Sequence, residues 1–128
     1  MTDFKIFDIA GSALVAQSMR LNTVASNLAN ADTVSGDPTK VFRARHPVFE
    51  SRGDGVRVSS VVESERPPIM RHEPGHPAAD AAGNVYAPDI DPVEQMVDMI
   101  SASRSYQSNL EVMSASKDLM LATLRLGQ

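Results

Sequence analysis

The segment from Asp91 to Gln128 most strongly constrains the fold. It opens with an aspartate suited to an N-cap, a proline at the first helical position and a glutamate three residues past the cap. Gly127 is a typical helix stop. Between these signals, residues that are mostly apolar or small recur at alternating steps of three and four: Met96, Met99, Ser103, Tyr106, Leu110, Met113, Met120 and Leu124, with Lys117 as the one charged member. The sequence therefore predicts one long helix with a narrow packing seam.

The amino-terminal segment carries a matching seam. It consists of Phe7, Ala10, Leu14, Gln17, Leu21, Val24, Leu28 and Ala31. From Ile9 to Ala31 the only charged residue is Arg20, whereas a surface helix of a soluble monomer has a charged outer stripe. We expect this helix to be buried on several sides. The alternative is a partly frayed helix that is simply short of charge.

The end of the first helix and the start of an insert follow. The run from Asn27 to Thr33 favours helix termination, with Asn30 or Asp32 near the C-cap. Apolar residues then alternate with polar ones over Val41–Glu50, until Pro47 ends that strand or marks an edge.

Two further patterns complete the insert. Gly53-Asp54-Gly55 is a turn, and the alternation from Val56 to Val62 predicts a hairpin with the preceding strand. The proline-rich stretch from Ser64 to Pro88 is predicted to be an ordered loop or a short third strand, with Gly83-Asn84 turning into Val85-Tyr86.

These patterns define the expected fold class. It is mainly α with a small β insert: long N- and C-terminal helices pair as a coiled coil, and an antiparallel β hairpin and loop lie between them. The expected segments are 1–33, 34–90 and 91–128. Aromatic residues make up only 5% of the chain, against seven methionines, which favours a thin helix-to-helix seam over a large compact core.

Composition excludes several functions. A net charge of -4 without a cluster of Lys and Arg argues against nucleic acid or an anionic membrane surface as the partner. No apolar run approaches the ~20 residues of a membrane span, so we expect no membrane insertion. The absence of cysteine rules out disulfides and thiolate metal sites. Asp3, Lys5 and Asp8 make Met1–Ala10 unlike a cleavable secretory signal.

Catalytic and metal-binding patterns are weak. His72 and His76 lie near Asp80, but Pro74-Gly75 prevents the helix that would bring both imidazoles onto one face. We therefore predict no catalytic residue, no metal ligand and no cofactor.

The polar cluster Ser101–Asn109 lies within the predicted C-terminal helix. A solvated helix face is one interpretation, and contact with other chains is the one we favour. Adding the two seams gives the expected subunit-interface residues: Phe7, Leu14, Leu21, Asn27, Leu28, Asn30, Met96, Met99, Ser103, Arg104, Tyr106, Gln107, Asn109, Leu110, Met113, Met120 and Leu124.

Both ends of the chain resemble a known family. Asn27-Leu28-Ala29-Asn30 with Thr33, and the run Ser103–Asn109, are similar to the paired terminal signatures of bacterial flagellar axial proteins of the rod and hook. The run from Asp91–Val97 through Tyr106-Gln107 is the most specific match. The extended loop between Gly36 and Phe42 is similar to the proximal-rod branch of that family.

The resemblance implies a structural, non-enzymatic subunit of the basal-body proximal rod, which stacks helically through its terminal helices and transmits torque. It implies an inner coiled-coil layer, with the insert outside. Implied partners are copies of itself, other flagellar rod proteins, the rod-to-ring adaptor, the basal-body rings and the flagellar type III export apparatus. The implied location is the periplasm-spanning rod, reached without a cleaved signal peptide.

Two other functions remain as alternatives. A cytoplasmic helical adaptor or homodimer would be stably helical alone. A small metal-dependent hydrolase would use His72, His76 and Asp80. We also expect the lightly charged ends to be completed only by other molecules, with helix formation coupled to assembly.

Overall fold

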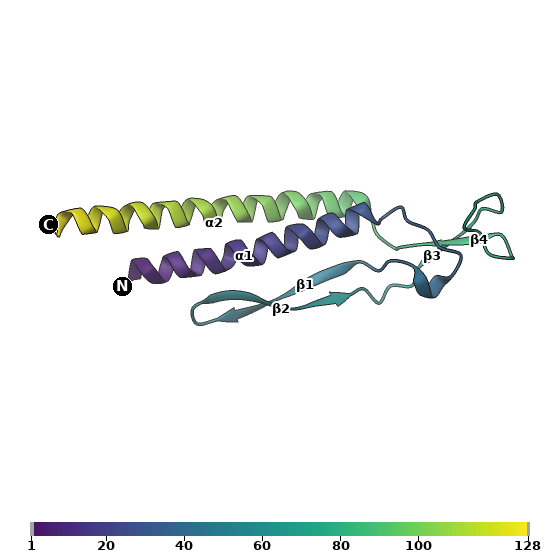
Figure 1. The fold of residues 1–128 in the computed structure, drawn as a ribbon, viewed down its shortest axis with the longest axis horizontal. Helices are drawn as coiled ribbons and strands as arrows, with labels where there is room; N and C mark the ends of the chain where they lie inside the picture. The colour runs from purple at the N-terminus through teal and green to yellow at the C-terminus, as the bar shows by residue number, and fades with distance from the viewer. Residues whose placement is uncertain (1, 128) are drawn as a thin grey trace. The chain divides into compact units, whose positions relative to one another are not determined.

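A computed structural model describes residues 2–127 and contains two long helices with strands between them (Figure 1). The elements in chain order are α1 (Thr2–Ala29), the 3-10 helix η1 (Pro38–Lys40), β1 (Arg45–Arg52), β2 (Gly55–Glu63), β3 (Ile69–His72), β4 (Asn84–Ala87) and α2 (Pro92–Leu126). The predicted fold class is confirmed: it is mainly α, with long N- and C-terminal helices that pack together and a small antiparallel β insert between them in the chain.

The helix boundaries follow the capping signals in the sequence. At the start of α2, the Val93 amide donates a 2.9 Å hydrogen bond to Asp91 Oδ1, as expected of an N-cap. Just beyond the end of α2, the Gly127 amide bonds to the Thr123 carbonyl at 3.2 Å. At the end of α1, Asn30 Nδ2 donates to the Ser26 carbonyl at 2.8 Å, which confirms Asn30 near the C-cap.

The predicted hairpin is present as β1 paired with β2. The first strand begins at Arg45, later than the expected start at Val41. Just before it, Ala44 is buried and its carbonyl accepts the Ser64 amide at 2.7 Å. Pro47 lies inside β1 and does not end it. In a two-stranded sheet each strand keeps one unpaired side, where a proline is tolerated.

The predicted third strand is also present, but it does not extend the hairpin. Instead, β3 pairs antiparallel with β4 in a separate sheet, with Ile69 opposite Ala87 and His72 opposite Asn84. Ser35 and Tyr86 extend this sheet by one bridge, through amide-to-carbonyl bonds of 2.9 and 2.8 Å.

The chain divides into two compact units that each take in parts of both helices. Unit 1 comprises Met1–Asn22, Pro47–Val61 and Ile100–Gln128. Unit 2 comprises Thr23–His46 and Val62–Met99. The division follows contacts in space and not the order of the chain.

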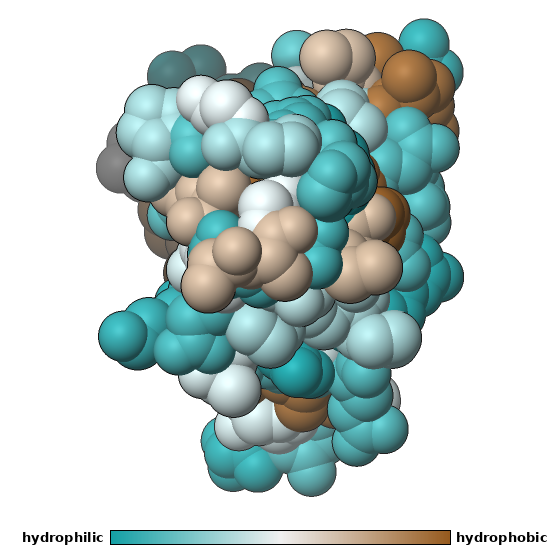
Figure 2. Space-filling view, turned by 90° about the vertical axis from the view of Figure 1, so that its right-hand side faces the viewer, coloured by the Kyte–Doolittle hydropathy of each residue, from teal (hydrophilic) through white to brown (hydrophobic). Residues whose placement is uncertain are grey.

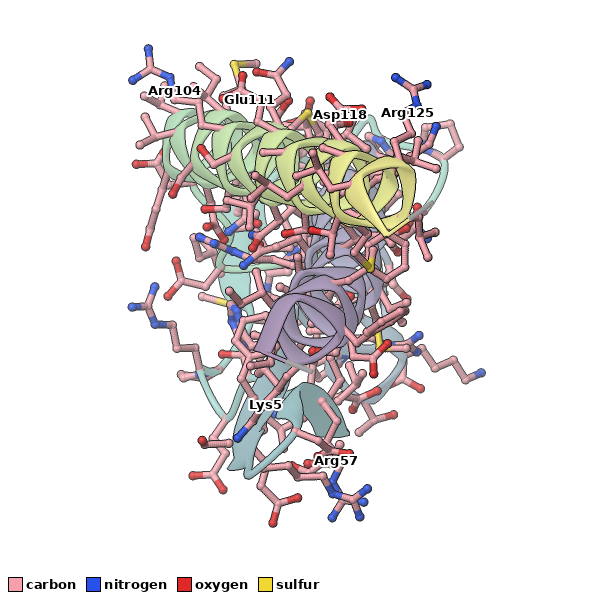
Figure 3. The ribbon with its side chains drawn as sticks, turned by 90° about the vertical axis from the view of Figure 1, so that its left-hand side faces the viewer. Lys5, Arg57, Arg104, Glu111, Asp118 and Arg125 are labelled. Atoms are coloured by element: carbon pink, nitrogen blue, oxygen red, sulfur yellow. The ribbon has the colours of Figure 1, made fainter. Side chains whose placement is uncertain are left out.

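In unit 1, α1 lies between α2 and the hairpin (Figures 1 and 3). Helix α1 contacts α2 at Gly11, where an added Cβ would lie 3.4 Å from Met113 Cε. On the other side of α1, Ser12 Oγ accepts a hydrogen bond from the Val56 amide at 3.1 Å. Small residues on α1 therefore permit contact on two sides.

In unit 2, the core surrounds Val85, which has no exposed surface. Val24, Ala31, Ala44 and Ala87 are also buried there. Figure 2 looks onto the side of the molecule that lies at the right of Figure 1, and shows mostly hydrophilic surface with separate brown hydrophobic patches. The core of this unit is thus small, and larger apolar side chains remain outside it.

The seam predicted on α2 is wrong at alternate positions. Met96, Leu110 and Leu124 were expected to face α1, yet they are 51%, 46% and 66% exposed. The residues just before Met96 and Leu110, which are Gln95 and Asn109, are more buried than they are. The buried residues of the described helix are Gln95, Ala102 and Ser116. Small side chains at the contact let two helices approach more closely than leucine or methionine would permit. Met99, Tyr106, Met113 and Met120 are partly buried, as expected.

Candidate subunit interface

Asn27 is the most completely enclosed polar residue of unit 2, with no exposed surface. Its Oδ1 accepts the Arg45 amide at 2.8 Å, and its Nδ2 donates to the Arg45 carbonyl at 2.8 Å. The second Nδ2 hydrogen points to Gln95 Oε1 at 3.2 Å. One side chain therefore connects the end of α1 to the start of β1 and to the first turns of α2.

The junction at Asn27 borders a polar hollow of about 90 Å³. Its lining includes the acidic residues Asp89, Asp91 and Glu94, together with His46 and Arg66. Asp91 is already engaged as the N-cap of α2. The hollow thus lies beside the N-cap of α2.

The predicted interface residues fall into three groups by exposure. Asn27 is fully buried, and its bonds lie within the chain, so we assign it to internal structure. The exposed residues are Met96, Arg104, Gln107, Leu110 and Leu124. The half-buried residues are Phe7, Leu14, Leu21, Leu28, Asn30, Met99, Ser103, Tyr106, Asn109, Met113 and Met120. Asn109 also bonds inside its own helix, with Nδ2 donating to the Ser105 carbonyl at 2.7 Å.

Bulky apolar side chains remain exposed along both helices. Near its start α2 presents Val93, Val97 and Ile100, which are 66%, 62% and 57% exposed. Among the described residues of α1, the most exposed large apolar side chain is Val15, at 68%. A stable monomer normally avoids contiguous surfaces of this kind.

Two open hollows flank the exposed ridge of α1 in unit 1. One, of about 390 Å³, is lined by Leu14, Ser18, Asn22 and Tyr106 together with the ridge residues Val15 and Met19. The other, of about 310 Å³, lies between the same ridge and β2. Among the described residues that line these hollows, only Arg57 carries a charge. Both hollows suit apolar or neutral polar side chains of another molecule.

In the loop between β3 and β4, the side chains of His76 and Asp80 bond to the loop's own backbone. His76 Nδ1 accepts the Ala78 amide at 3.0 Å, and Asp80 Oδ1 accepts the amides of Ala82 and Asn84 at 2.9 and 2.8 Å. His72 Nδ1 lies 3.1 Å from Asn84 Oδ1. Within residues 2–127, no group of three or more acidic or histidine side chains is placed to hold a metal ion. Within the same range, no helix has the length and apolarity to span a membrane.

A small electrostatic feature lies at η1. Asp37 Oδ1 accepts the Thr39 hydroxyl at 2.7 Å and the Thr39 amide at 2.9 Å. These hydrogen bonds, helped by nearby Lys40, hold the pKa of Asp37 below its usual value. The carboxylate therefore acts as a local cap for the loop after α1.

The sequence interpretation missed several residues that pack within the individual units. Gln95, Ala102 and Ser116 form the inward line of α2, and Ser12 with Gly55 joins α1 to the hairpin. A signal was available for α2, because Gln95, Ala102, Asn109 and Ser116 are spaced by seven. The contact between Ser12 and Gly55 has no local sequence signal.

Comparisons with known proteins place both terminal regions in one class. Residues 7–36 match the family described as "Flagella basal body rod protein". Residues 81–126 match the family described as "Flagellar basal body rod FlgEFG protein C-terminal". The two helices and the junction at Asn27 thus belong to a flagellar rod protein.

Curated relatives identify the branch. The chain is 52% identical to the flagellar basal-body rod protein FlgC of Salmonella typhimurium, 49% to that of Yersinia enterocolitica and 32% to that of Bacillus subtilis, each time over 100% of both chains. The chain belongs to the FlgC family of flagellar basal-body rod proteins. It is a structural rod subunit of the flagellar basal body and not an enzyme.

Proposed function

We propose that the chain assembles helically through its terminal helices as part of the proximal rod and there transmits torque. The observation that carries this proposal is the set of bulky apolar side chains that α2 leaves exposed, above all Val93, Val97 and Ile100. At roughly 25 cal/mol per Å² of apolar surface removed from water, covering such a row on every subunit gives a large cumulative stabilisation. Contacts that do not close on themselves produce a shaft of repeated subunits.

The proposed partners are copies of this chain, other rod proteins, the rod-to-ring adaptor, the basal-body rings and the export apparatus. Support comes from the family and from the two hollows beside Val15, which have Arg57 as the only charged residue among their described lining and which suit helices of neighbouring subunits. The proposed route to the periplasm-spanning rod is type III export. A shaft of this kind acts through stiffness, which dense helix packing provides.

The test is a substitution on the exposed row. In the bacterium that encodes the chain, Ile100→Asp should remove the chain from purified basal bodies and abolish swimming, since a carboxylate cannot be buried there unpaired. Ala81→Asp, an exposed change in the loop before β4, is the control and should assemble normally. Normal basal bodies with Ile100→Asp would refute assembly through this helix.

A further inference from the structure

The turn of the β1–β2 hairpin contains the only aspartate of the sequence that precedes a glycine, Asp54-Gly55, and no asparagine precedes a glycine. Asp54 is exposed in this turn, at the tip of the hairpin (Figure 1). Among residues 2–127, its carboxylate has no hydrogen-bond or ion-pair partner. The carboxyl group of Asp54 is therefore free to approach the peptide nitrogen of Gly55.

An aspartate side chain of this kind closes onto the peptide nitrogen that follows it. The Gly55 nitrogen bonds to the carboxyl carbon of protonated Asp54, the C–OH bond breaks, and the hydroxyl group leaves with the amide proton as water. A second water molecule opens the resulting succinimide ring at either of its carbonyls. One opening restores aspartate. The other gives isoaspartate, in which the main chain runs through the side-chain carbon and is longer by one methylene group.

The other aspartates of the chain are less suited to this reaction. Each of them precedes a residue that has a side chain, which restricts the backbone rotation that closes the ring. Asp37 and Asp91 precede proline, whose nitrogen has no hydrogen to lose. The Asp80 carboxylate is held in place, because its Oδ1 accepts two backbone amides at 2.9 and 2.8 Å. These differences single out Asp54.

The residues that follow Asp54 are packed tightly against α1. An added Cβ at Gly55 would collide with Ser12 Oγ and would lie 3.5 Å from the Cα of Ile9. The next amide, of Val56, donates a 3.1 Å hydrogen bond to Ser12 Oγ. A methylene group inserted into the main chain just before Gly55 must displace this backbone, because a close-packed contact has no spare room. The modification would therefore separate the hairpin from Ser12.

We propose that Asp54 is a site of spontaneous isoaspartate formation, and that the product loosens the hairpin from α1. The proposal goes beyond the proposed function, since it concerns the chain itself and not the surfaces that join it to other molecules. The hollow between α1 and β2 is lined by Ser12 and Val56. Its shape therefore changes in copies of the protein that carry isoaspartate.

The reaction is tested by incubating the purified full chain at neutral pH and digesting it with trypsin. Residues 53–57 form a tryptic peptide, because Arg52 precedes it and Arg57 ends it. Chromatography and electron-transfer fragmentation distinguish its aspartate and isoaspartate forms, which have equal mass. We expect isoaspartate at Asp54 to exceed that at any other aspartate by on the order of tenfold. Asp54→Asn should form the same ring faster, with loss of ammonia, and Asp54→Glu, which needs a larger ring, should form none.

The structural consequence is tested by brief trypsin treatment of the folded chain before and after incubation. Cleavage after Arg57, relative to cleavage after Arg71 in unit 2, should rise by roughly threefold or more in the fraction that carries isoaspartate. The same ratio should stay constant in Asp54→Glu incubated for the same time. Isoaspartate that forms at Asp54 only in urea, or no faster there than at other aspartates, would overturn the proposed site. An unchanged cleavage ratio in the modified fraction would overturn the proposed loosening.

Discussion

Asn27 and Arg45 are joined by two hydrogen bonds of 2.8 Å, one in each direction between the side-chain amide and the backbone. A residue of α1 thus fixes the start of β1, and its remaining donor reaches Gln95 on α2. Because Asn27 is fully buried, no water can replace these bonds.

Asn27→Ala should lower the free energy of unfolding by about 2 to 4 kcal/mol, since it leaves the Arg45 amide and Gln95 without their partner. Denaturant unfolding of the purified full chain would measure this loss. Asn22→Ala, a change at an exposed asparagine of the same helix, should cost less than about 0.5 kcal/mol. Equal effects of the two substitutions would show that the junction contributes nothing.

Gly55→Ala should weaken the contact between the hairpin and α1. Gly55 has φ of +139°, and an added Cβ would collide with Ser12 Oγ. We expect a cost of about 1 to 3 kcal/mol and faster proteolysis within β2. The paired control is Gly53→Ala, where an added Cβ meets nothing within 4 Å. A hairpin equally resistant to protease in both variants would contradict this account.

Leu110→Asp should block assembly while leaving the folded chain and its export intact, because Leu110 is already 46% exposed. Swimming, and the chain content of purified basal bodies, are the measurements. Glu111→Gln, one residue along, should have little effect on either. Leu21→Asp should also abolish assembly, but this residue is half-buried, so it should destabilise the chain as well. Unimpaired swimming with Leu110→Asp would count against the proposed interface.

The last turns of α2 should be poorly protected in the isolated subunit. Leu119, Leu124 and Leu126 are 58%, 66% and 87% exposed, so little packing within the chain stabilises this part of the helix. Amide exchange should be fast over residues 117–126 and slow near Asn27. In assembled basal bodies the same amides should become protected. Slow exchange there in the free chain would show that the helix needs no neighbour.

Lowering the pH should destabilise the loop around η1, because it protonates Asp37. The pKa of Asp37 is lowered in the folded state. The stability that its carboxylate contributes is therefore present above the unfolded pKa and is lost as the pH falls through the folded pKa. Thr39→Ala, which removes the hydroxyl donor, should raise the Asp37 pKa toward the usual range. An NMR titration of the carboxyl carbon would measure this shift, and an unchanged pKa would mean that the Thr39 hydroxyl is not its main cause.

Local signals predicted the elements well, and close contacts explain what they missed. Asp91-Pro92 and Gly127 placed the ends of α2, and Gly53-Asp54-Gly55 placed the hairpin turn. The inward face of α2 was predicted one position away at alternate steps, because bulky residues such as Leu110 were favoured over Ala102 and Ser116. Small residues face inward where backbones approach, and a helix pattern alone does not reveal the distance between axes.

The junction at Asn27 could not be predicted in detail for a different reason. Its partners lie 18 and 68 positions away along the chain, and no periodic pattern connects them. The resemblance singled out Asn27, but pointed to contacts with other subunits. The structure places its hydrogen bonds inside the chain.

The amide of Asn27 stands where a neighbouring strand would otherwise supply a peptide group. By occupying both the NH and the CO of Arg45, it closes that part of the ribbon to strands of other molecules. In a protein that assembles with many copies of itself, this blocked edge favours association through helices over the fibrous aggregation that an unpaired strand edge promotes.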